Sequence, residues 1–220
     1  MSKPETDNQD AKTAMDNMYR WTRHVYDASR KYYLLGRDQL ISHLDAQPGQ
    51  HICEIGCGTA RNLIKMAKAY PQARFYGVDV SDEMLKTAQG CVDKSKTDIK
   101  LAQGYAQNFA PEALFNKGVA FEKVVFSYAL SIIPPWKDSL DHALTVLPKN
   151  GEIHVVDFHD MGELPVPFRR FIFWWLKLFH VYHKPEILQY LQQMVIDGKG
   201  TLETKTYYNG YTYLAVFKKI

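Results

Sequence analysis

Residues 51–62 read HICEIGCGTARN, and this segment indicates the architecture of the chain. The apolar run over 51–55 predicts a strand, the glycines at 56 and 58 predict a sharp turn, and a helical pattern begins at Arg61. Glycine suits such a turn because it accepts the required backbone dihedral angles and lets a ligand approach the chain closely. The segment therefore predicts a strand–turn–helix unit with a ligand site at the turn.

Strands and helices alternate along the rest of the chain, which predicts βαβ units and a parallel sheet. Near the C-terminus, two alternating runs around Asn209-Gly210 predict an antiparallel hairpin over 202–217. The expected fold is therefore α/β, with a seven-stranded, mostly parallel sheet. The other expected strands are 74–80, 99–104, 121–128 and 152–158, and the expected helices are 61–70, a helix opening at Ser81, and 136–147.

The composition is that of one ordinary globular domain. The chain has 220 residues, of which 46% are apolar and 23% charged, and its net charge of +3 is too mild to indicate a nucleic-acid partner. We expect a flexible tail over 1–14 and a single domain over 15–220. The polar N-terminus is unlike a signal peptide, and no apolar run has the length of a membrane-spanning helix. We expect a cytoplasmic protein that is peripherally associated with the inner face of the membrane.

Cysteine usage agrees with that compartment. Cys53, Cys57 and Cys91 lack the spacing of metal ligands or of a redox pair. We expect reduced thiols and no metal site.

Two carboxylates flank the predicted ligand site. Glu54 stands two residues before Gly56, and Asp79 closes the next strand, where a carboxylate can accept hydrogen bonds from both hydroxyls of a ribose. The glycines alone are also compatible with an ordinary strand-to-helix turn, but their combination with two acids favours a nucleotide ligand. A dinucleotide fingerprint would need glycine where Arg61 stands, so a pyrophosphate is not expected.

This arrangement resembles the first motif of the class I S-adenosylmethionine-dependent methyltransferases. The resemblance implies a Rossmann-like fold and S-adenosylmethionine as cofactor, with Asp79 on the ribose, Val80 beside the adenine and Ser127 near the methionine amine. Tyr105 replaces the family's usual acidic contact to the adenine, and Ala60 replaces the third glycine of the motif. The expected cofactor-binding residues are Arg37, Glu54, Gly56, Cys57, Gly58, Asp79, Val80, Met84, Tyr105, Ala106 and Ser127.

A narrower resemblance covers nearly the whole chain after residue 14. Residues 19–41 (YRWTRHVYDASRKYYLLGRDQLI), 127–140 (SYALSIIPPWKDSL) and 208–217 (YNGYTYLAVF) resemble the bacterial betaine-lipid methyltransferases. This resemblance implies successive N-methylation of diacylglyceryl-homoserine to diacylglyceryl-trimethylhomoserine. Methylation of phosphatidylethanolamine or of a small amine is an alternative, and so is a non-catalytic regulator that binds S-adenosylmethionine on membranes.

Aromatic residues suit the methylation of an amine. Successive methylation produces a quaternary cation, which aromatic faces attract. Tyr33 and Tyr128 are the preferred catalytic candidates among the rings. The alternative is that these rings only pack an N-terminal helical lid, residues 15–44, onto the domain.

A cation and an imidazole complete the predicted site. Arg37 shares a helical face with Tyr33, and its planar guanidinium could hold the carboxylate of the cofactor or of the homoserine, or could simply pair with Asp38. His159, just past the strand 152–158, could accept the proton lost from the substrate amine, although many N-methylations need no dedicated base.

Residues 168–184, FRRFIFWWLKLFHVYHK, lie between two prolines in a predicted insertion over 162–186. At about 100° per residue the cations gather on one side of a helix, and nearly all the rings occupy the remaining arc. This pattern is typical of a helix in a membrane interface, so a lipid substrate and an anionic membrane surface are the expected partners. The alternative is a helix buried against the sheet. The cations are Arg169, Arg170, Lys177, His180 and Lys184.

Overall fold

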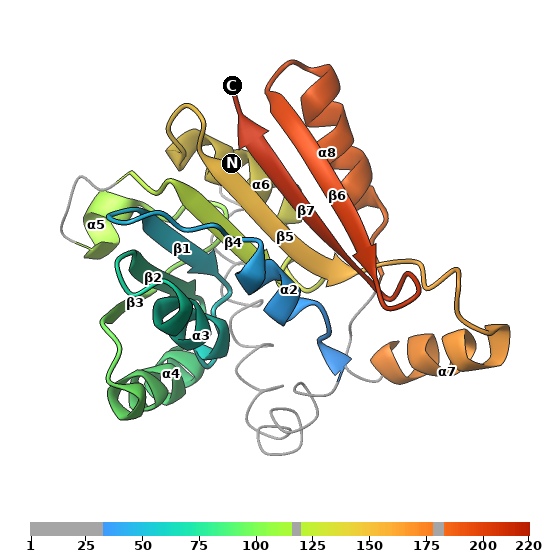
Figure 1. Ribbon diagram of the computed structural model, residues 1–220, viewed down its shortest axis with the longest axis horizontal. Coiled ribbons are helices and arrows are strands. Elements are labelled where there is room, and N and C mark those ends of the chain that lie inside the picture. The colour runs from blue at the N-terminus through green and yellow to red at the C-terminus, as the bar shows by residue number, and fades with distance from the viewer. Residues whose placement is uncertain (1–32, 116–119, 178–182) are drawn as a thin grey trace, which may run out of the picture.

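The computed structural model describes residues 33–115, 120–177 and 183–220, which form a seven-stranded sheet with helices on both faces (Figure 1). The strand order is β3-β2-β1-β4-β5-β7-β6, and β7 runs antiparallel to both of its neighbours while the other pairs are parallel. This confirms the predicted α/β fold and the C-terminal hairpin. The strands are β1 (His51–Ile55), β2 (Arg74–Asp79), β3 (Ile99–Gln103), β4 (Lys123–Ser127), β5 (Glu152–Phe158), β6 (Gly200–Tyr207) and β7 (Thr212–Lys219).

Helices cover the two faces of the sheet in separate groups (Figure 1). α2, α3 and α4 bury apolar side chains such as Leu40, Leu63 and Ala88 on one face, and α5, α6 and α8 bury residues such as Leu140 and Leu191 on the other. The central strands are thus covered on both sides, which explains their unbroken apolar runs. The helices are α2 (Arg37–Ser42), α3 (Arg61–Ala69), α4 (Asp82–Ser95), α5 (Pro111–Phe115), α6 (Trp136–Val146), α7 (Val166–Lys177) and α8 (Glu186–Ile196).

α4 begins where the sequence predicts. The Ser81 hydroxyl accepts a hydrogen bond from the amide of Met84 at 3.4 Å, which satisfies one of the free amides of the first turn. Asp82 and Glu83 follow in that turn, where the helix dipole favours negative charge.

The C-terminal hairpin has a longer loop than the Asn-Gly pair predicts. Tyr207 pairs with Thr212, so residues 208–211 all lie in the loop. Tyr211 explains the difference, because it turns inward: its hydroxyl donates to the carbonyl of Tyr33 at 2.8 Å, and its ring lies against that of Phe158.

The helix predicted over 168–184 is wrong at both ends. α7 starts at Val166, since a proline at position 167 is tolerated in the first turn of a helix. Lys184 lies outside α7 and precedes α8, and its Nζ donates to the carbonyls of Leu130 (3.2 Å) and Ile133 (3.4 Å). Lys184 therefore does not belong to the predicted basic side of the helix.

Some predictions concern residues that the structure does not describe. These are the tail 1–14, the lid before residue 33 and His180. Within the described ranges, no helix is long and apolar enough to cross a membrane. In the same ranges, no group of three or more His, Cys, Asp or Glu could hold a metal ion.

Candidate functional site

The turn after β1 carries the backbone across the carboxyl end of the sheet. The amide of Gly56 donates to the carbonyl of Val78 on β2 at 2.8 Å. Gly56 has a φ of 70°, and a Cβ there would lie 2.9 Å from the Cβ of Ala129, so both conformation and contact require glycine. Gly58 and Ala60 also have positive φ, at 53° and 61°. Ala60 thus adopts the left-handed conformation that the missing third glycine would favour.

Asp79 joins this turn to the start of α4. Its Oδ2 accepts from the amide of Gly58 at 2.8 Å, and its Oδ1 accepts from the amide of Ser81 at 3.0 Å. A carboxylate offers about four lone-pair sites, so these two bonds are compatible with further bonds from the hydroxyls of a ligand. Asp79 therefore shapes the loop and remains suited to a ribose.

Glu54 is fully buried at the end of β1. Its Oε1 accepts from Nδ2 of Asn62 at 2.7 Å, while its buried Oε2 has no hydrogen-bond partner among the described residues. Burial raises the pKa of Glu54 to about 7, although the bond from Asn62 and the charge of Arg37 favour the carboxylate. Such an oxygen is suited to a donor or cation that a ligand supplies.

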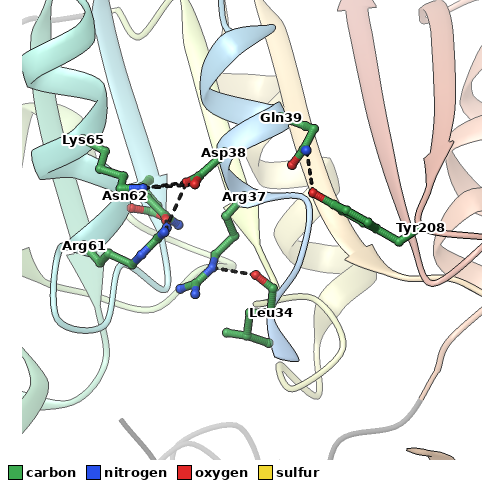
Figure 2. A network of polar contacts seen from close by, with 9 residues as sticks. Leu34, Arg37, Asp38, Gln39, Arg61, Asn62, Lys65 and Tyr208 are labelled. Carbon is green, nitrogen blue, oxygen red and sulfur yellow. Dashed lines mark hydrogen bonds and ion pairs between the residues drawn. The ribbon is translucent and has the colours of Figure 1, made fainter. Parts of the chain in front are cut away.

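α2 brings a buried cation to the same place. Arg37 is the first residue of α2, and its Nε donates to the carbonyl of Leu34 at 2.9 Å (Figure 2). Asp38 pairs instead with Arg61 at 3.1 Å and Lys65 at 2.9 Å, which holds α2 against the start of α3 (Figure 2). Asp38 therefore pairs with two cations of α3, while Arg37 lies at the site.

These elements enclose a cavity of about 370 Å³ at the carboxyl end of the sheet. The hydroxyl of Ser127, at the end of β4, is buried there without a hydrogen-bond partner among the described residues. The structure thus brings together a cation, a carboxylate and a hydroxyl that the sequence places far apart. The predicted residues in the lining are Arg37, Glu54, Gly56, Cys57, Gly58 and Ser127.

Half of the lining was not predicted. Thr87 and Cys91 stand four residues apart on α4, a spacing that puts them on one helical face and could have suggested their role. Arg61 and Asn62 directly follow the glycine turn, at the start of α3. The residues missed are Leu34, Thr59, Arg61, Asn62, Thr87 and Cys91.

Comparison with known proteins identifies the family. Residues 46–204, most of the chain, match the family described as "Methyltransferase domain". The chain belongs to this methyltransferase family. Its structure is similar to that of the plantazolicin methyltransferase BpumL, solved in complex with SAH, with a TM-score of 0.66 and 13% identity over 98% of this chain and 99% of that one. It is also similar to the N-methyltransferase NodS from Bradyrhizobium japonicum, with a TM-score of 0.56 and 18% identity over 90% of this chain and 98% of that one.

Curated relatives are similar over part of the methyltransferase. A demethylmenaquinone methyltransferase of Geobacillus sp. is 25% identical over 145 residues, which span 59% of this chain and 59% of that enzyme. A tRNA (guanine-N(7)-)-methyltransferase of Macrococcus caseolyticus is 25% identical over 134 residues, 55% of this chain and 60% of that enzyme. The chain therefore aligns with less than two thirds of either relative.

The cofactor of the methyltransferase is S-adenosylmethionine, which when bound supplies an activated methyl group on a positively charged sulfur. The cavity fits its methionine part. The oxygens of Glu54 and Ser127 that lack a partner in the described part of the chain would accept from an ammonium, and Arg37 would face a carboxylate. Asp79 would hold the ribose, next to the glycine turn.

Asp79 lies outside the cavity lining, and so do four further predicted cofactor residues near it. Val80 and Tyr105 are half-buried, while Met84 and Ala106 are buried. They stay close to the site because the amide of Gly104, after β3, donates to the carbonyl of Asp79 at 3.0 Å. Their contact with the adenine stays a prediction.

Tyr128 fastens the segment before α2 to the sheet. Its hydroxyl donates to the carbonyl of Leu35 and lies 3.0 Å from Oγ1 of Thr212 on β7. The ring is buried, and burial raises the pKa of Tyr128 well above its ordinary value. This placement favours a structural role over the predicted catalytic one.

Tyr33 and His159 lie at the carboxyl end of β5. The buried Tyr33 ring stacks on Phe158 with centroids 6.5 Å apart and meets Trp175 of α7 edge-on at 4.8 Å. His159 is half-buried directly after β5, with its ring 6.3 Å from that of His183. Neither belongs to the described cavity lining, although Tyr33 directly precedes a residue that does.

Proposed function

We propose that this methyltransferase successively N-methylates the amine of diacylglyceryl-homoserine and so produces diacylglyceryl-trimethylhomoserine. The three segments that resemble the betaine-lipid methyltransferases, 19–41, 127–140 and 208–217, support this substrate. Their described parts converge beside Leu34 of the cavity lining: the Tyr128 hydroxyl bonds to Leu35, and the Tyr211 hydroxyl bonds to Tyr33. This convergence is the observation that carries the proposal.

The same convergence gathers aromatic rings around the end of β5. Phe158 lies at the centre, with ring centroids 4.6 Å from Tyr128, 5.8 Å from Tyr211 and 6.5 Å from Tyr33. Trp175 adds a further ring through its contact with Tyr33. Aromatic faces attract quaternary ammonium groups, so this cluster suits a product that becomes a permanent cation.

A residue of the protein can accept the proton that the substrate ammonium loses. An ammonium must lose a proton before its nitrogen can be methylated, and each of the three methylations needs a free lone pair. In our proposal His159 accepts this proton, since its half-buried imidazole directly follows Phe158 at the carboxyl end of β5. The buried rings exclude water and keep the amine neutral once it is deprotonated.

The test is methylation of the lipid in detergent micelles, which supply the substrate without a bilayer. Purified protein, S-adenosylmethionine and diacylglyceryl-homoserine should give mono-, di- and trimethylated lipid by mass spectrometry. Micelles of phosphatidylethanolamine serve as the control substrate. Methylation of phosphatidylethanolamine alone would assign the alternative headgroup. Cofactor binding without methylation of any lipid or small amine would support the non-catalytic regulator.

A further inference from the structure

α7 presents an unusual surface to solvent. Four of the seven exposed large hydrophobic residues in the described part of the chain belong to it. Three of these, Phe168, Phe171 and Trp174, are spaced three residues apart, and their exposed fractions are 53%, 56% and 57%. This spacing aligns them along one side of the helix, and we call these three residues the aromatic stripe.

The side of α7 opposite Trp174 is anchored, because Ile172 and Leu176 are buried. Trp175, which borders the stripe four residues after Phe171, meets Tyr33 edge-on at 4.8 Å. The aromatic stripe is therefore held outward by a helix whose inner side belongs to the core. Figure 1 shows α7 standing out from the body of the protein beyond the end of β5. The same end of the sheet carries the cofactor cavity, through Ser127 of the parallel strand β4.

The charge around the aromatic stripe is positive. α7 contains Arg169, Arg170 and Lys177, and no acidic residue stands between Glu163 and Glu186. Arg170 is exposed on α7, next in sequence to Phe171. Exposed rings beside cations match the chemistry of an anionic lipid surface, where rings enter the acyl boundary and cations meet phosphate headgroups.

The area of the aromatic stripe also favours a membrane over a protein partner. Three large aromatic side chains of roughly 150–250 Å² each, about half exposed, present only about 200–400 Å² together. A stable protein–protein interface needs roughly 800 Å² on each partner. Insertion of rings into a bilayer has no such requirement, because each ring transfers from water on its own.

We propose that the aromatic stripe of α7, with Arg170 beside it, docks the protein on an anionic lipid bilayer. The inference deepens the proposed function and rests on it for its purpose, since a diacyl lipid is met at a bilayer surface. Docking through the outer side of α7 places its inner side, and Tyr33 with it, between the bilayer and the cofactor cavity.

The test measures docking without turnover. Vesicles of phosphatidylcholine, with or without phosphatidylglycerol, contain no methylatable headgroup, and bound protein is measured by flotation. The wild type should bind the phosphatidylglycerol vesicles, and the double variant Phe171→Ser/Trp174→Ser should bind at least about tenfold more weakly. Arg170→Glu should reduce the dependence on phosphatidylglycerol. Ile196→Ser is the matched control, because this residue is 77% exposed on α8, away from the stripe.

Four outcomes would overturn the proposal. The first is wild-type protein that does not bind the vesicles, and the second is a double variant that binds as tightly as the wild type. The third is a wild-type dimer that dissociates in the double variant while vesicle binding persists, which would show that the stripe binds a second copy of the chain.

S-adenosylmethionine affinity, measured by calorimetry, reports whether a variant is folded, and Phe168→Ser repeats the test in the first turn of the helix. The fourth outcome is that the double variant and Phe168→Ser both lose cofactor binding and unfold at a lower temperature than the wild type. The rings would then be structural, and the proposal would fail. Failure of lipid methylation in micelles would leave this vesicle result unchanged, so the two proposals fail separately.

Discussion

At the scale of single residues, Asp79 serves the loop and the ligand at once. Its two oxygens accept from the amides of Gly58 and Ser81, which fixes the glycine turn against the start of α4. A carboxylate held in this way needs little rearrangement to accept from ribose hydroxyls, so the cost of ordering it is met when the chain folds.

We expect Asp79→Ala to weaken S-adenosylmethionine binding by about 1–3 kcal/mol, because a buried ribose loses a charge-assisted acceptor. Calorimetry measures the affinity. Asp93→Asn is the matched control, since this exposed acid at the far end of α4 meets Gln89 at 2.8 Å. An unchanged affinity in a folded Asp79→Ala protein would show that the ribose is held elsewhere.

Arg37 faces the cavity, and its anionic partner can be identified with a cofactor analogue. If Arg37 holds the cofactor's carboxylate, Arg37→Ala should weaken S-adenosylmethionine binding about tenfold or more. Decarboxylated S-adenosylmethionine should bind the variant and the wild type equally. Arg74→Ala, at the exposed start of β2, is the control. An unchanged cofactor affinity with a raised KM for the homoserine lipid would assign Arg37 to the substrate instead.

At the scale of elements, the position of α2 depends on how closely the chain before it approaches the sheet. Gly36 has a φ of 80°, and a Cβ there would lie 2.8 Å from Cγ2 of Thr212 and 3.1 Å from Cγ2 of Val156. This close contact with β5 and β7 sets where α2 starts. It therefore sets where Arg37 points.

Gly36→Ala should destabilise the protein and weaken cofactor binding together. Gly49→Ala is a matched control, because Gly49 has a φ of 81° and nothing lies within 4 Å of its added Cβ. The control carries only the left-handed backbone cost of about 1–2 kcal/mol. Gly36→Ala adds crowding of about 1–3 kcal/mol and displaces Arg37. Chemical denaturation and calorimetry measure the two effects, and equal costs for both variants would contradict a tight seat for this segment.

Local patterns predict elements well where the reason for an element is local. Ser81 begins α4 and the glycine turn separates β1 from α3 because capping and backbone conformation depend on adjacent residues. The hairpin loop and the end of α7 differ from the predictions for tertiary reasons. The Tyr211 hydroxyl donates a hydrogen bond to the carbonyl of Tyr33, and Lys184 donates to the carbonyls of Leu130 and Ile133. These contacts join residues that are far apart in the sequence, so the local pattern of apolar residues does not predict them.

At the scale of the whole molecule, the sequence predicts those residues of the site that lie at strand ends. Residues at the carboxyl ends of β1 and β4, such as Glu54 and Ser127, meet because the parallel sheet aligns those ends. Thr87 and Cys91 enter through the packing of α4 on the sheet, which the sequence does not specify residue by residue. Tyr128 shows the reverse case, since its position at a strand end predicts catalysis while its bond to Leu35 indicates packing.

Buried ionisable groups link this site to the stability of the whole protein. Burial raises the pKa of Glu54 to about 7 and that of Asp157 to about 6, so the folded protein holds protons that the unfolded chain has released. Each of these carboxyls makes the free energy of unfolding fall as pH rises from the unfolded to the folded pKa. Burial lowers the pKa of His154, which has the opposite effect below its ordinary value, because the unfolded chain then binds the extra proton.

Comparison of Glu54→Gln with the wild type isolates one of these groups. The glutamine keeps an acceptor for Asn62 and removes the charge whose burial raises the pKa of Glu54 to about 7. Relative to the wild type, the variant should therefore gain free energy of unfolding as pH rises from about 5 to 8, by up to about 3 kcal/mol at the upper end. Urea denaturation without S-adenosylmethionine, repeated across this range, measures the difference. Its size should not depend on His154, which both proteins share. If the difference in free energy of unfolding stays constant from pH 5 to 8, Glu54 ionises in the folded protein as easily as in the unfolded chain. Neighbouring groups of the protein would then already compensate its negative charge before any ligand binds.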